Sequence, residues 1–124
     1  MKKICLAWSG VVGLMDALTG LMLIVCPAWV LSQLGLAEMA GESMLFLRWI
    51  GVFVASVGMS YAWAFRGDGS AVWRFTSLVR VMVAVFVTAN IVAGSLAPAW
   101  AGVAVTDAVV AAVQIYGLVR RWWS

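Results

Sequence analysis

The chain has 124 residues, of which 65% are apolar and 10% are charged. Soluble domains average about 45–50% apolar residues even with glycine included, and about 25% charged residues. These proportions argue against a water-soluble enzyme or a disordered segment, and they indicate that lipid is the solvent for most of the chain. The net charge of +3 is spread along the sequence, so no basic cluster is dense enough to bind nucleic acid.

Four predominantly apolar stretches each reach the length of roughly 20 residues that a helix needs to cross a hydrocarbon core. They cover about residues 4–26, 43–65, 72–94 and 100–119. Turn-forming residues separate them: Pro27 follows the first stretch, the glycine-containing segment 66–70 follows the second, and Pro98 follows the third. The sequence therefore predicts an all-α integral membrane protein, a four-helix bundle that forms one domain over residues 1–124.

Two features concern the start of the chain. The apolar spacing from Trp29 to Leu36 predicts a short helix that lies in the membrane interface. The first residues also resemble a cleaved lipoprotein signal, with two lysines, an apolar run and Cys26. This alternative is disfavoured, because the run is longer than the about 7–15 residues of a signal peptide and Asp16 interrupts it.

The distribution of Lys and Arg predicts which side of the membrane each connection faces. The first and third connections contain neither residue, and the basic residues near the termini and the second connection are Lys2, Lys3, Arg66, Arg74, Arg120 and Arg121. Cytoplasmic connections are enriched in these residues. We therefore expect a multi-pass protein of the bacterial cytoplasmic (inner) membrane, with both termini in the cytoplasm.

Tryptophan is concentrated near the ends of the predicted spans. Its amphipathic ring favours the boundary between lipid and water, where membrane proteins carry aromatic belts. The residues expected in such belts are Trp29, Trp49, Trp63, Trp73, Trp100, Trp122 and Trp123.

Several polar residues lie inside the apolar stretches, namely Asp16, Arg48, Arg80, Asp107, Asn90 and Gln114. A charge near the middle of a membrane is strongly unfavourable unless it is paired or hydrated. A rise of about 1.5 Å per residue places both acids in the outer half of the membrane, within reach of both arginines. We therefore expect the two acids and two arginines to form a net-neutral quartet.

Helical spacing turns each charge toward a face that also carries small residues. Small residues let helix backbones approach closely, and such packing, together with interhelical hydrogen bonds, holds helices together in lipid. The residues expected at these helix contacts are Gly13, Gly20, Gly51, Gly58, Ala104 and Ala111.

Two interpretations of the quartet are open. In the first, the ion pairs set the order and register of the helices, and the chain is a non-enzymatic membrane protein that acts as a homo-oligomer or as an accessory subunit of a membrane complex. In the second, Asp16 and Asp107 bind a proton, a cation or a polar ligand, with the arginines as counter-charges. The chain would then be a small oligomeric transporter or channel.

No catalytic residue, metal site or cofactor is predicted. The sequence has no histidine, so the usual nitrogen ligands of haem and zinc are missing. Cys5 and Cys26 lie at opposite ends of the first stretch, about 30 Å apart along a helix, which is too far for a disulfide. A quinone or a lipid is still a candidate ligand. Binding of either one requires mainly an apolar groove with one or two polar groups, and Arg48, Asp107 and Tyr61 could supply these groups. The expected partners are the lipid bilayer and other membrane chains.

A few short motifs resemble small four-helix bacterial inner-membrane proteins, among them the DoxX-like family. They are the Gly-x-x-Asp from Gly13 to Asp16, the turn at Pro27, and Arg48-Trp49-Ile50-Gly51 at the start of the second stretch. The resemblance covers the whole chain as topology and implies the same four-span fold. DoxX-like members are associated with oxidation of sulfur compounds coupled to quinone. None of their functional residues is matched here, so the resemblance implies no activity for this chain.

Overall fold

The computed structural model describes residues 1–124, and the chain is all-α, with 4 helices long and apolar enough to cross a membrane. A short helix, α2, and two 3₁₀ helices, η1 and η2, lie between or extend the long helices. The elements in chain order are α1 (Lys2–Val25), α2 (Pro27–Gln33), α3 (Glu42–Ser60), η1 (Tyr61–Arg66), α4 (Gly69–Val92), η2 (Pro98–Trp100) and α5 (Ala101–Val119). When η1 is counted with α3 and η2 with α5, the largest difference from the expected spans is at the start of α4, which begins at residue 69 rather than 72.

The connections between the long helices follow from local chemistry. Gly67 and Gly94 have φ values of +98° and +81°, in the left-handed region that glycine enters without a steric penalty. Gly67 ends η1 just before α4 begins, and Gly94 lies just after α4 ends. A glycine therefore marks each end of α4. The short helix expected in the first connection is α2, and its Leu31 is buried against Leu23 and Leu47. This contact ties the first connection to α1 and α3.

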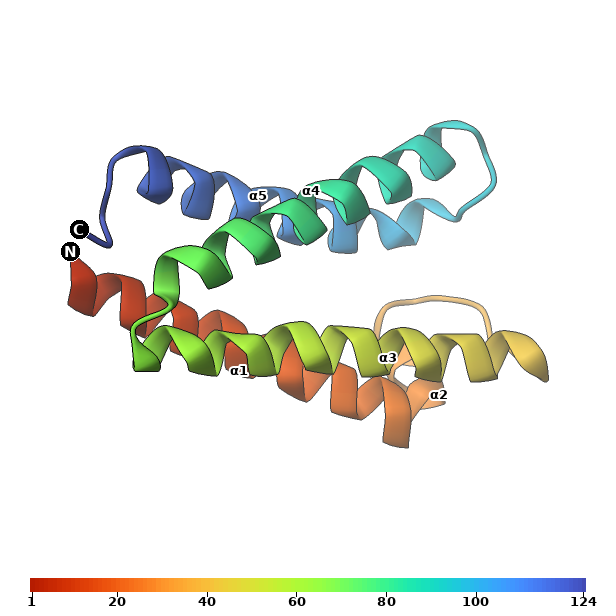
Figure 1. The fold of residues 1–124 in the computed structure, drawn as a ribbon. Coiled ribbons are helices and arrows are strands. Elements are labelled where there is room, and N and C mark those ends of the chain that lie inside the picture. Colours follow the sequence, from red (N-terminus) through yellow and green to blue (C-terminus); the bar gives the residue numbers. More distant parts are fainter.

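The long helices form two pairs within the bundle. α1 packs along α3, and α4 packs along α5. Figure 1 shows the two pairs as separate layers that approach each other where the two termini lie and where α3 leads into α4. The layers diverge toward the connection between α4 and α5 (Figure 1). The fold is therefore two helical hairpins that meet mainly at one end.

Glycines bring the backbones of α1 and α3 into direct contact. A Cβ atom at Gly20 would lie 2.5 Å from the carbonyl oxygen of Gly51, and one at Gly58 would lie 2.6 Å from the carbonyl oxygen of Gly13. Real Cβ atoms do not approach backbone this closely, so no larger residue fits without moving a helix. The two alanines expected at helix contacts, Ala104 and Ala111, are buried on α5.

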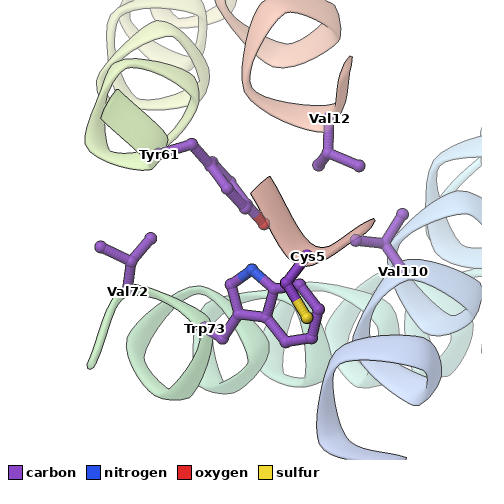
Figure 2. Close-up of a cluster of buried hydrophobic side chains, with 6 residues drawn as sticks. All are labelled: Cys5, Val12, Tyr61, Val72, Trp73 and Val110. Atoms are coloured by element: carbon purple, nitrogen blue, oxygen red, sulfur yellow. The ribbon is translucent and has the colours of Figure 1, made fainter. Parts of the chain in front are cut away.

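A hydrophobic core joins the two hairpins at the end that carries the termini. Its members are Cys5, Val12, Tyr61, Val72, Trp73 and Val110. Figure 2 shows the rings of Tyr61 and Trp73 reaching into the same space. Trp73 is only 1% exposed, and its Nε1 donates a hydrogen bond of 2.9 Å to Ser9 Oγ. The expectation that Trp73 faces the membrane interface is therefore wrong, because a serine on α1 provides an acceptor for its N–H inside the core.

The C-terminal residues fold back over this core. Arg121 has a φ of 57°, which reverses the chain after α5, and the Trp122 N–H donates to the Gly117 carbonyl over 2.9 Å. The ring of Trp123 then packs edge-on against Trp73, with 5.2 Å between ring centroids. Trp122 and Trp123 thus cover the core rather than project outward.

Candidate functional site

Three charged side chains from three helices meet between the hairpins. Arg80 of α4 donates through Nη2 to Oδ2 of Asp16 on α1, and through Nη1 to Oδ1 of Asp107 on α5 over 2.6 Å. Arg80 is 3% exposed and Asp16 is 8% exposed. We call Asp16, Arg80 and Asp107 the ion-pair triad. One guanidinium thus joins the two hairpins through charge-assisted hydrogen bonds.

The helical repeat explains why the triad side chains point inward. Asp16 lies one turn after Gly13 on the buried face of α1, and Arg80 lies one turn after the buried Thr76 on α4. Asp107 lies one turn before Ala111 on the buried face of α5. Small neighbours on these faces leave room between the helices for three charged side chains.

A second polar cluster extends from the triad toward the core. Gln114 is fully buried, its Oε1 accepts a hydrogen bond of 2.6 Å from the Tyr61 hydroxyl, and its Nε2 donates to Thr76 Oγ1 and Ser77 Oγ, each at 3.0 Å. The Tyr61 hydroxyl in turn accepts from Arg80 Nε and Nη2, both at 3.4 Å. This cluster links α5, α4 and η1, so both hairpins contribute to it.

The expected quartet is a triad in the structure, because Arg48 does not join it. Arg48 is exposed and forms no ion pair, since the only salt bridges are those of Arg80. Leu47 takes the inward position one turn before Gly51, and neighbouring residues on a helix are rotated by about 100° from each other. Asn90 is also apart from the triad, and its Nδ2 donates to the Phe86 carbonyl of its own helix over 2.8 Å. The site is therefore smaller than the sequence indicates.

Part of the second cluster has a signal in the sequence. Thr76 precedes Arg80 by four residues and Gln114 follows Asp107 by seven, so each shares a helix face with a charge of the triad. Tyr61 has no such signal for this role, because it comes from η1 on the other hairpin. Its contact with Arg80 depends on how the hairpins dock.

The triad contains one more acid than base, and each acid keeps an oxygen free. Asp16 Oδ1 and Asp107 Oδ2 accept no hydrogen bond in the structure. All three triad residues line a cavity of about 230 Å³, which we call the lateral cavity. The remaining lining residues are all apolar: Ile50, Phe53, Val54, Val57, Val79, Val83 and Val103. Ile50 and Phe53 are 53% and 61% exposed, so the cavity reaches the outer apolar surface.

The arrangement is an ion pair with spare acceptor capacity. Arg80 holds both carboxylates in place, while their free oxygens can hold a proton or a small cation. No set of three His, Cys, Asp or Glu side chains is placed to hold a metal ion, and Cys5 and Cys26 are both free thiols. Comparison with protein-family models, curated proteins and solved structures finds no match for this chain.

Proposed function

We propose that this chain is a non-enzymatic membrane protein that acts as a homo-oligomer or as an accessory subunit of a larger membrane complex. In this proposal the triad is a clamp between the two hairpins. The observation that supports this structural role of the triad is that Arg80 binds Asp16 and Asp107 at the same time. Lipid supplies no hydrophobic drive for helix association, so hydrogen bonds and close packing must hold the hairpins together. The triad does this beyond the core cluster, toward the end where the helices diverge.

The outer face of α3 supports association with another chain. Phe46, Trp49 and Phe53 stack in a row, with ring centroids 6.0 Å and 6.4 Å apart, and each is more than half exposed. Such a row is an apolar surface of large aromatic rings, the kind of side chain that contributes most to packing at interfaces. A helix of a second chain can pack against it.

Native mass spectrometry of the protein, extracted gently from its own membranes at native expression, tests this proposal. We expect either a discrete homo-oligomer or a complex with stoichiometric foreign subunits. A monomer, under conditions that keep other complexes of the same membranes intact, would contradict it.

Charge exchange tests the clamp itself. Arg80→Asp places three acidic side chains together and should abolish the accumulation of folded protein. Combining it with Asp107→Arg restores two acids and one base, so folded protein should be recovered at least in part. The clamp is excluded if neither this combination nor the one with Asp16→Arg recovers any folded protein.

A second candidate, a small oligomeric transporter or channel for a cation, is favoured by the free carboxylate oxygens that line the lateral cavity. The two candidates predict different behaviour of Asp107→Asn. A clamp predicts less folded protein in the membrane, whereas a transport site predicts normal abundance and loss of cation or proton flux in proteoliposomes. Asp68→Asn makes the same change in an exposed connection and should alter neither quantity.

A further inference from the structure

One end of the molecule gathers nearly all of its positive charge. Every Lys and Arg except Arg48 and Arg80 lies in residues 2–3, 66–74 or 120–121. Figure 1 shows that these segments come together where both termini and the passage from α3 to α4 lie. Asp68 is the only acid in them. This end therefore carries a large excess of positive charge.

A hollow of about 400 Å³ lies at this end between the start of α4 and the end of α5. Its lining residues, which we call the basic pocket, are Ser70, Arg74, Leu118, Arg121, Trp123 and Ser124. A second hollow of about 210 Å³ shares Ser70 and Trp123 with it and adds Lys2 to its lining. The basic pocket thus brings cationic side chains from α4 and from the C-terminal tail to one place.

The two arginines of the basic pocket are not neutralised by an acidic side chain. Arg74 and Arg121 form no salt bridge, and Asp68 lies on a different hollow, beside Trp63. Arg121 also has the only positive φ among the residues other than glycine, at 57°. This conformation belongs to the C-terminal cap of α5, where the Trp122 N–H reaches the Gly117 carbonyl.

Further donors surround the basic pocket. Ser70 lies in the first turn of α4, where backbone N–H groups have no partner within the helix and favour a negative charge. The side chain of Asp68, at the cap position, does not bond to them.

We propose that the basic pocket binds the phosphate group of an anionic phospholipid. Arginine is suited to phosphate, because its planar fork donates two hydrogen bonds to two oxygens. The pocket lies at the ends of two membrane-spanning helices, where lipid headgroups are found and where basic pockets between helices bind anionic lipids. Val119, which follows the pocket residue Leu118 in the sequence, is 73% exposed, so an acyl chain can continue along α5. This inference is independent of the triad and of any partner chain.

Lipid titration of the purified full-length chain in detergent, followed by native mass spectrometry, tests the proposal. We expect phosphatidylglycerol to bind saturably, and phosphatidylcholine with the same acyl chains to bind at least tenfold more weakly. Arg74→Gln and Arg121→Gln should each weaken phosphatidylglycerol binding by about fivefold, the effect of one basic residue near an anionic lipid surface.

Arg66→Gln and Arg120→Gln are the matched controls, because both residues lie at the same end and neither lines the pocket. They should change binding by less than a factor of two. Equal losses in all four arginine variants would indicate diffuse charge attraction and overturn the proposal, as would equal binding of phosphatidylcholine. Displacement of the lipid by low millimolar inorganic phosphate would also overturn it, in favour of a site for free phosphate.

Discussion

Arg48 and Arg80 are the same residue type on two membrane-spanning helices, and their surroundings are opposite. Arg80 is buried between two carboxylates and near the Tyr61 hydroxyl, whereas Arg48 is exposed and has no acidic partner. An arginine side chain is long enough to extend toward the membrane interface when nothing holds it. The same charge is therefore structural on one helix and peripheral on the other.

Arg80→Leu should destabilise the folded chain by about 3–5 kcal/mol, because it leaves the buried Asp16 and the half-buried Asp107 without their counter-charge. The free energy of unfolding in mixed micelles, followed by helix content during a denaturant titration, measures this change. Arg48→Leu removes the same side chain from an exposed position and should leave the free energy of unfolding almost unchanged. Equal losses in both variants would show that the triad has no special role in stability.

Gln114→Leu should cost roughly 1–3 kcal/mol of stability, since it leaves the buried Ser77 hydroxyl without a partner and the buried Tyr61 hydroxyl without its acceptor. The same unfolding titration measures it. Asn90→Leu is the control, because Asn90 bonds only to its own helix. A loss for Asn90→Leu as large as that for Gln114→Leu would contradict the assignment of Gln114 to a buried cluster.

At the scale of elements, the contact between α1 and α3 depends on the absence of side chains. Gly58→Leu should weaken the folded state by about 1–3 kcal/mol or more, because the new side chain would meet the backbone of α1 near Gly13 and Ala17. Gly102→Leu is the matched control, since a Cβ at Gly102 meets nothing within 4 Å. Thermal aggregation of the purified variants, followed by size-exclusion chromatography, compares them. Similar melting temperatures for the two variants would refute close α1–α3 packing.

The elements themselves could be predicted well from the sequence, but their contacts could not. Apolar length and the Pro and Gly breaks predict the ends of the spans to within three residues when η1 and η2 are counted with their helices, because a helix in lipid must contain all of its backbone hydrogen bonds. Trp73 shows the limit of such reasoning. Its position near the end of a span is typical of an aromatic belt. In the structure, however, Trp73 is buried in the core, where its N–H donates a hydrogen bond to Ser9 on α1.

At the scale of the whole molecule, the remaining prediction is its orientation. The excess of Lys and Arg at one end predicts that both termini face the cytoplasm. Impermeant maleimide applied to intact cells tests this in a Cys26→Ala background, where Cys5 is only 1% exposed and should not react. Ser95→Cys, between α4 and α5, should be labelled from outside, and Ser124→Cys should be labelled only after lysis. The reverse pattern would invert the topology.

The sequence by itself determined that the chain is all-α and has four helices able to span a membrane. Apolar runs of this length can satisfy their backbone hydrogen bonds in lipid only as helices or closed barrels. The small residues on each run repeat with a helical period, which decides for helices. Only the tertiary structure decided that α1 pairs with α3 and α4 with α5, and that Arg80 rather than Arg48 meets both acids. Periodicity determines the angle of a residue on its own helix. The rotation of each helix about its axis, and the helix it faces, depend on how all the helices pack together, which no single segment contains.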